Sequence, residues 1–416
     1  MRLTGISLLF TLLSSSVLAE DWNFSGFGNV GYSYDTSDSF GYMRDLTQKA
    51  DPDSDGSFLP DSKIGAQINY NINFEWDVTA QYVIAERAGD ELLDGLELAF
   101  LAYRPTSDFD IRVGRVGYNV FWFADTRRVD YGHLWVRLPQ EIYSWIPLQN
   151  IDGIDFTYRF YVDDVSFSTA FQYGSTQATT DLHEGYEPNR FYSNSALSLS
   201  LVANWDMWRA RASFAQLRVD SDLPPQVSTL KDGLQTVGSS GLGPISDEAN
   251  LLNEKMSVTG GMVRYGQIGI EYNDGTWHLL SELVKVKTDK DLLPEGQGGY
   301  ISLGRRFNEF TPYMIRSWFN PETDKLEAQY DWSILPDPQL AQLQQGAITS
   351  INATLINQSI WSFGTRWDIS EQISLKAQID WVHIEDTGHG LWATNLLEPK
   401  PETRVQVYSL SASFLF

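Results

Sequence analysis

The chain has 416 residues, no cysteine, and 54 acidic against 30 basic side chains. Without cysteine it has no disulfide framework and none of the usual thiol or cysteine–zinc chemistry. The net charge of -24 argues against a nucleic-acid partner, because such a partner requires a basic surface.

The first segment has the pattern of a cleavable signal peptide. Arg2 precedes an apolar stretch, and Val17 and Ala19 lie where signal peptidase requires small side chains. Residues 1–19 are therefore predicted to be removed on export, which leaves residues 20–416 as a single domain. No later segment has the roughly 18 consecutive apolar residues of a membrane-spanning helix, so a membrane crossing would require strands.

About 16 later segments alternate between apolar and polar side chains, as strands with two different faces do. They are residues 24–34, 63–72, 74–86, 96–104, 110–117, 153–161, 165–173, 195–205, 208–219, 257–272, 276–287, 298–306, 311–318, 355–367, 374–384 and 404–416. Short and long connections alternate between them, as the periplasmic turns and extracellular loops of outer-membrane barrels do. The predicted fold class is all-β, a transmembrane antiparallel β-barrel.

The number of strands is left open between about 16 and about 18. Connections 220–255 and 319–353 are each long enough to contain further structure, and the second has a helical pattern near residues 340–345.

The two faces of each predicted strand suit two different solvents. Val78, Tyr82 and Ile84 share one face of their segment, whereas Asp77 and Thr79 share the other. An Arg or Lys at the membrane midplane costs ~2–4 kcal/mol, so the charged faces should line an aqueous lumen and the apolar faces should contact lipid.

The chain ends on an aromatic residue at the tip of a strand. Phe414 and Phe416 share one face, and Ser411 and Ser413 share the other. This ending resembles the C-terminal signature of outer-membrane β-barrels. The resemblance implies that Phe416 is the assembly signal and that the protein lies in the bacterial outer membrane among its lipids.

The connection after the fifth predicted strand is the most informative about function. Residues 118–150 are aromatic and basic, whereas the other long connections are acidic. A connection this long usually has a function. In its position and in its Gly-Arg, Val-Arg-Leu-Pro and Glu-Ile-Tyr pieces it resembles the third external loop of Gram-negative porins, which folds into the channel. The resemblance implies a homotrimeric, cofactor-free channel for passive diffusion of ions and small hydrophilic solutes.

Charged residues of this segment and of the strands form a candidate constriction. The set comprises Arg112, Arg115, Arg127, Arg128, Arg137, Arg159, Arg209 and Arg211 with Glu75, Asp77, Glu97 and Asp155. Basic and acidic walls facing each other would create a transverse field that orients dipolar solutes. The competing interpretation is that each arginine neutralises a neighbouring carboxylate or anchors the segment to the wall.

Two other functions remain open. The arginines suit a substrate-selective channel for anions or sugars, with Trp122 or Trp135 as stacking platforms. Alternatively, the barrel serves mainly as a surface receptor or anchor whose acidic loops bind a partner. Catalysis is not predicted, because the five histidines lack metal-ligand spacing and no Ser–His set stands out.

One acidic connection has part of a calcium-binding pattern. Asp51, Asp53 and Asp55, followed by Gly56, resemble the opening half of an EF-hand loop. The pattern breaks at its twelfth position, which is Ser62. A solvated acidic loop tip is the competing interpretation, and calcium is the one metal that the sequence suggests.

Overall fold

The computed structural model describes residues 21–51, 56–181, 188–394 and 401–416. The predicted signal peptide lies outside these ranges, as do Asp53 and Asp55 of the candidate calcium loop.

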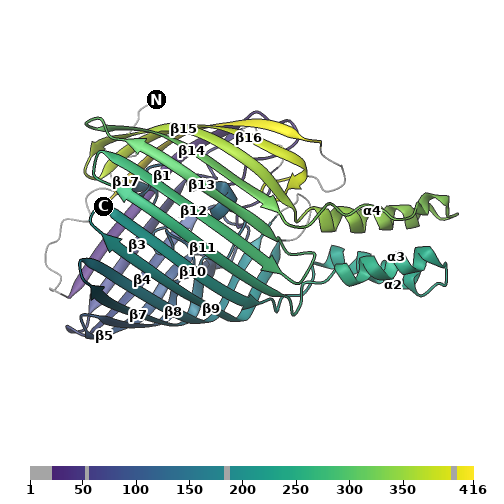
Figure 1. Cartoon of the computed structure of the whole chain (residues 1–416), viewed down its shortest axis with the longest axis horizontal. Coiled ribbons are helices and arrows are strands. Elements are labelled where there is room, and N and C mark those ends of the chain that lie inside the picture. Colours follow the sequence, from purple (N-terminus) through teal and green to yellow (C-terminus); the bar gives the residue numbers. More distant parts are fainter. Residues whose placement is uncertain (1–20, 52–55, 182–187, 395–400) are drawn as a thin grey trace, which may run out of the picture.

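The described residues form one closed antiparallel barrel (Figure 1). Its sheet has seventeen strands, one of which, β2 (Gly56–Ser57), has only two residues. The other sixteen are β1 (Trp22–Asp35), β3 (Lys63–Asn71), β4 (Trp76–Ala85), β5 (Leu96–Thr106), β6 (Phe109–Gly117), β7 (Asn150–Val162), β8 (Val165–Thr180), β9 (Asn189–Trp205), β10 (Trp208–Arg218), β11 (Met262–Asn273), β12 (Trp277–Thr288), β13 (Gly296–Arg305), β14 (Phe310–Pro321), β15 (Ile356–Ser370), β16 (Ile373–His389) and β17 (Thr403–Leu415). The predicted barrel and its strand segments are confirmed.

The two ends of the chain close the barrel. Strand β17 pairs with β1, with Phe27 opposite Leu415 and Asp35 opposite Val407. Gly26 and Phe416 exchange both backbone hydrogen bonds, at 2.7 and 3.0 Å. The last residue therefore completes the seam between the first and last strands.

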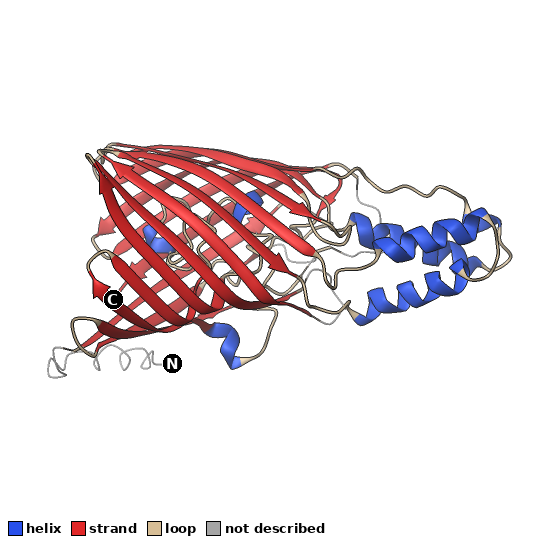
Figure 2. Ribbon diagram, turned by 60° about the horizontal axis from the view of Figure 1, so that its bottom comes forward, coloured by secondary structure: helices blue, strands red, loops and turns tan. Residues whose placement is uncertain are grey.

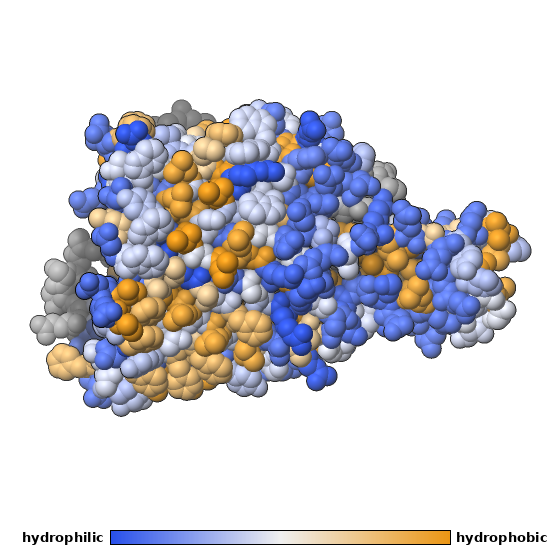
Figure 3. All heavy atoms as spheres, viewed as in Figure 1, coloured by the Kyte–Doolittle hydropathy of each residue, from blue (hydrophilic) through white to orange (hydrophobic). Residues whose placement is uncertain are grey.

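The outer and inner faces have the predicted character. Phe74, Val78 and Ile84 are exposed on the outside, whereas Asp77 and Thr79 are buried on the inside. Figure 3 shows apolar side chains gathered over the barrel wall and hydrophilic ones toward the end that carries the helices.

One end of the barrel has short turns and the other has long loops. Three of the short turns contain a non-glycine residue with positive φ, namely Asp163, Asp206 and Asn308. Asp and Asn tolerate this conformation, which the tightest hairpins require. We call this end the short-turn end and the opposite one the long-loop end.

Three helices project from the long-loop end (Figure 2). They are α2 (Pro225–Gly238), α3 (Pro244–Lys255) and α4 (Pro338–Asn352), and they pack around a separate apolar core that includes Leu234, Ala249 and Trp332. The two long connections therefore contain helices, so the alternative of about 18 strands is wrong. The helical pattern near residues 340–345 falls within α4.

The remaining helical pieces are short. They are α1 (Gln140–Tyr143) and the 3₁₀ turns η1 (Leu92–Gly95), η2 (Asp130–Gly132) and η3 (Trp332–Ile334). In the part of the chain that the structure describes, no helix has both the length and the apolar character needed to cross a membrane.

Candidate channel and its inserted segment

Residues 118–150 leave the barrel wall and return to it at almost the same point. Gly117 at the end of β6 pairs with Asn150 at the start of β7. The Tyr118 amide donates a hydrogen bond of 2.9 Å to the Gln149 carbonyl. The segment, called the inserted segment below, is therefore a closed excursion whose two ends lie side by side.

The inserted segment reaches the far wall of the barrel. The Trp135 indole Nε1 donates a hydrogen bond of 2.8 Å to Ser302 Oγ on β13. Lys376 Nζ on β16 donates to the carbonyls of Asp130, His133 and Trp135 at 2.6 to 2.9 Å. These partners face inward, so the segment lies in the lumen, where Figure 2 shows loops and a short helix inside the strands.

Other parts of the segment are bound to the near wall. The Asn119 amide donates to Gln172 Oε1 on β8 at 2.8 Å. Ser213 on β10 donates to the Val120 carbonyl at 2.7 Å. The segment is thus hydrogen-bonded to strands on several sides of the lumen.

Apolar packing fills the lumen as well. Phe121, Trp135 and Ile142 of the segment are at most 1% exposed, and they belong to one cluster with inward-facing Val284 and Ile360. A buried apolar side chain of this size contributes ~1.5–3 kcal/mol relative to an exposed one. The segment is therefore packed like a protein core.

The inner faces of the strands explain where that packing occurs. Along β17, the inward-facing residues from the short-turn end are Ser413, Ser411 and Ser409, and then Val407 and Val405. On β12, Glu282 is followed inside by Val284 and Val286. On these two strands the inner face therefore becomes apolar toward the long-loop end, with the buried Leu280 of β12 as an apolar exception nearer the short-turn end.

A buried ion-pair network joins the segment to the first long connection. Arg44 Nη2 donates to Asp130 Oδ1 at 2.6 Å, and its Nη1 lies 3.3 Å from Asp61 Oδ1. Lys63 Nζ lies 2.9 Å from Asp130 Oδ2. Arg137 Nη2 donates to Asp61 Oδ2 at 2.9 Å.

These cations control the charge of the buried carboxylates. Burial acts to raise the pKa of Asp130, but Arg44 and Lys63 hold it well below its usual value. Burial likewise opposes ionisation of Asp61, and Arg137 and Arg44 hold its pKa below the usual value. Both residues therefore stay ionised at neutral pH and tie the two loops together.

Most of the predicted constriction residues form direct ion pairs. The pairs are Arg112 with Asp155, Arg115 with Asp152, Arg128 with Glu97, Arg159 with Asp110, and Arg104 with Asp77. Basic and acidic side chains are thus immediate neighbours and do not form two facing walls. The competing interpretation, neutralisation of adjacent carboxylates, describes these residues better than the transverse field.

Two arginines of the segment have anchoring roles. Arg127 donates to the Tyr143 carbonyl within the segment, and its guanidinium lies 5.1 Å from the centre of the Phe121 ring. Arg137 Nη1 donates to Asp380 Oδ2 on β16 at 2.8 Å. The first arginine holds the segment's own fold, and the second fixes it to the wall.

Two predicted residues lie away from the constriction. Glu75 is exposed in the short turn before β4, so its assignment to the lumen is wrong. Arg159 also lies toward the short-turn end of its strand, with its side chain 44% exposed.

Arg209 and Arg211, on the inner face of β10, differ from the rest of the set. The Arg209 guanidinium lies 4.9 Å from the centre of the Trp122 ring. Arg211 Nη2 donates to Asn119 through its carbonyl at 2.9 Å and its Oδ1 at 2.7 Å. Within the described ranges neither has a carboxylate at ion-pair distance, so both bind the inserted segment directly and not through an acidic partner.

Sequence reasoning missed several members of the network, including Arg44, Asp61, Asp130, Lys376 and Asp380. Alternation alone indicates that Lys376 and Asp380 face the lumen, since they share a face with Gln378. Arg44, Asp61 and Asp130 lie in irregular loops, where spacing predicts no partner.

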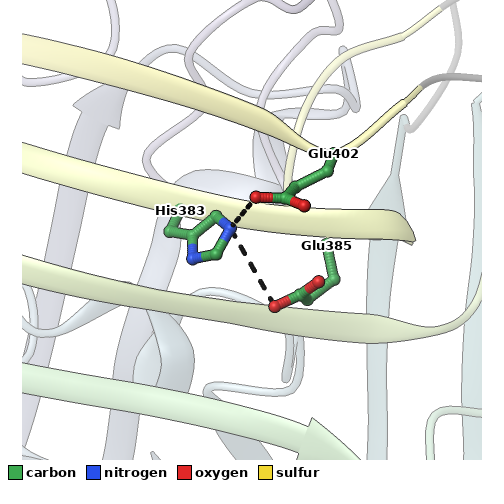
Figure 4. Close-up of side chains that lie close together, drawn as sticks. All are labelled: His383, Glu385 and Glu402. Carbon is green, nitrogen blue, oxygen red and sulfur yellow. Dashed lines mark hydrogen bonds and ion pairs between the residues drawn. The ribbon is translucent and has the colours of Figure 1, made fainter.

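A separate cluster lies on the outer face near the long-loop end (Figure 4). His383 Nε2 lies 2.7 Å from Glu402 Oε1 and 3.9 Å from Glu385 Oε1, so the three could hold a metal ion. Arg404 is 3.9 Å from Glu402 and already supplies a positive charge. The contacts among His383, Glu402 and Arg404 therefore explain the cluster without a metal ion. Of the predicted calcium ligands, only Asp51 is described.

No family model matches this chain, and no curated protein matches its sequence. Solved structures do match its shape. The outer-membrane-expressed OmpT of Vibrio cholerae superposes with a TM-score of 0.53 at 10% identity, over 96% of this chain and 99% of its own. Salmonella typhi OmpF, solved in complex with daunomycin, gives 0.52 at 12% identity, over 95% and 97%.

An anion-selective porin from Comamonas acidovorans gives a TM-score of 0.50 at 10% identity, over 95% of this chain and 99% of its own. The chain has the fold of the outer-membrane porins. Identity this low shows the fold alone, so the function of this barrel must be inferred from its own residues.

Proposed function

We propose that the protein is an outer-membrane channel for passive diffusion, and that the inserted segment makes it selective. Porin barrels of about 16 strands ordinarily leave an aqueous channel. Here the observation that carries the proposal is the bonding of residues 118–150 to both the near and the far wall. The cavities beside Arg137 and beside Arg127 are about 20 Å³ each, and a third beside Arg115 and Arg128 is about 50 Å³, room for about one to a few water molecules.

This geometry favours the selective alternative over a wide general-diffusion pore. Small hydrophilic solutes remain the expected cargo of the polar half of the lumen, where, among the described residues, Arg209 and Arg211 have no carboxylate at ion-pair distance. The same proposal includes no cofactor and no catalytic step. It also includes export through residues 1–19, insertion with Phe416 as assembly signal, and assembly as a homotrimer in the outer-membrane lipids.

Single-channel recording in planar bilayers tests the proposal. The comparison is between the full-length mature protein and a variant in which residues 119–148 are replaced by a short Gly-Ser linker. The linker is feasible because Tyr118 and Gln149 are already hydrogen-bonded. We expect small conductance steps from the intact protein and steps several-fold larger from the variant.

Heat-modifiable electrophoretic migration shows whether each protein has a closed barrel. Equal, large conductance from both folded proteins would show that the segment does not narrow the path. Absence of steps from both would reject the channel and favour the receptor or anchor function. The projection of α2, α3 and α4 from the long-loop end is the observation that supports this second candidate.

A further inference from the structure

The long-loop end of the barrel contains a cavity of about 340 Å³. Small-molecule sites in proteins typically have about 300–1,000 Å³. The cavity borders the inserted segment, because Tyr118, Val120 and Trp145 of that segment line it. A molecule in this cavity would therefore contact the segment that fills the lumen.

Three parts of the structure contribute to the walls. Leu217, Val263 and Val286 come from the inner faces of β10, β11 and β12. Val227 and Leu230 come from α2, at the base of the helical projection. The cavity is thus enclosed by barrel, segment and helices, and all three present apolar side chains to it.

The polar side chains in the lining are largely engaged by the protein's own backbone. Ser221 Oγ accepts from the Tyr192 amide at 2.6 Å and donates to the Tyr192 carbonyl at 3.2 Å. Thr354 Oγ1 donates to the Ile351 carbonyl at 3.0 Å. Thr180 Oγ1 donates to the Asn189 carbonyl at 3.3 Å. Within the described ranges, Asp181 is the only charged residue of the lining.

This lining contrasts with the rest of the molecule. The chain carries a net charge of -24, and most of its long connections are acidic. An apolar cavity at such a mouth costs free energy when it holds only water, and that free energy is recovered when an apolar molecule displaces the water. The aromatic rings of Tyr118, Trp145 and Phe191 add flat surfaces suited to stacking.

We propose that this cavity binds a small, uncharged, mainly apolar and preferably aromatic molecule. The cavity volume is too small for a folded partner or a second copy of the chain. Its lining residues on β10 to β12 are mostly inward-facing, so the barrel wall separates it from the acyl chains of the membrane. The occupant is therefore a solute that arrives from the aqueous side.

The inference concerns binding at the long-loop end and is separate from the hydrophilic cargo proposed for the lumen. Binding is measurable without conductance. The test uses the full mature protein held in an amphipathic polymer, titrated with the neutral aromatic probe N-phenyl-1-naphthylamine. Energy transfer from the tryptophans of the protein to the probe reports binding, and its sensitivity to a change in the cavity wall assigns the site.

The informative variant is Val227→Asp, which adds a charge to the cavity wall from a helix outside the barrel. Its matched control is Thr229→Asp, an exposed position on the same helix that does not line the cavity. We expect saturable binding to the unmodified protein and the control, and at least tenfold weaker binding to Val227→Asp, with unchanged heat-modifiable migration in all three.

Non-saturable signal from the unmodified protein, or equal affinity for all three proteins, would overturn the proposed binding site. Saturable, variant-sensitive binding without conductance steps would uphold the site while rejecting the channel. Conductance steps without saturable binding would uphold the channel and reject the binding site.

Discussion

Arg137 donates a hydrogen bond to Asp380 across 2.8 Å, and both side chains are only 6% exposed. The same guanidinium bonds Asp61, so one residue of the inserted segment holds carboxylates from two other parts of the chain. Removing one partner of a buried ion pair costs ~3–5 kcal/mol, because the remaining charge stays buried without compensation.

Arg137→Met is therefore expected to lower the free energy of unfolding by about 3–5 kcal/mol. Urea denaturation followed by tryptophan fluorescence measures the change. The control is Arg159→Met, which breaks the partly exposed pair with Asp110 and should cost only ~0–1 kcal/mol. Equal losses in the two variants would show that Arg137 does not anchor the segment.

The stability of the packed segment should depend on pH through Glu141. Burial raises the pKa of Glu141 to about 7, against an ordinary value of 4.5. Because the folded protein binds this proton more tightly than the unfolded chain, the stabilising contribution is complete below pH 4.5 and is lost as pH rises through about 7. We expect the melting temperature of the unmodified protein to fall across this interval relative to that of Glu141→Gln.

Glu141→Gln should remove that part of the pH dependence and stabilise the protein at alkaline pH. Glu86, whose pKa burial raises to about 6, is present in both proteins. Burial lowers the pKa of His133 to about 3, so the unfolded chain binds that proton more tightly and this residue acts in the opposite direction between about pH 3 and 6.5. His133 is likewise present in both proteins. The difference between their melting temperatures therefore reports the contribution of Glu141. Parallel melting curves for the two proteins at all pH values would contradict the prediction.

The helical projection should unfold separately from the barrel. Glu248 is buried and accepts hydrogen bonds from Trp332 Nε1 at 2.7 Å, Gln344 Nε2 at 3.0 Å and the Gln329 amide at 2.6 Å. Glu248→Ala leaves the buried Trp332 Nε1 without its acceptor, at ~1–3 kcal/mol, whereas Gln344 Nε2 keeps the Tyr330 carbonyl at 2.7 Å. Limited proteolysis should then cleave within residues 225–255 and 332–352 while the strands stay protected. Glu254→Ala, an exposed change on the same helix, should leave the digestion pattern unchanged.

The seam of the barrel should tolerate no side chain at Gly26. A Cβ atom there would lie 2.3 Å from the Phe416 ring. Gly26→Val should therefore displace the last residue and lower the fraction of heat-modifiable, folded barrel. At Gly266 a Cβ atom meets nothing within 4 Å, which makes Gly266→Val the matched control. The same folded fraction in both variants would show that the Phe416 contact is dispensable for closure.

The barrel was predictable because strand alternation is a local signal that a single sequence carries. The alternation of apolar and polar residues around Asp77 and Val78 is enough to assign the first to the inner face and the second to the outer face. The packing of the lumen was not predicted, although a signal for it exists. Inward positions such as Val286, Val405 and Val407 are apolar where an aqueous pore requires polar side chains.

The ion-pair network could not be predicted for a different reason. Arg44 and Asp130 are separated by 86 positions and lie in irregular loops, so no periodic pattern relates them. The same holds for Glu248 and Trp332, which meet only because two long connections fold together outside the barrel. In each case the partner is set by tertiary packing, which leaves no local trace in the sequence.

The hydrogen bond between Tyr118 and Gln149 also has an evolutionary consequence. Because it closes the base of residues 118–150, an insertion, deletion or exchange within them changes neither the register of β6 and β7 nor the circumference of the barrel. The contents of the lumen can therefore change by exchange of residues 118–150 alone, while the strands of the barrel wall stay constant.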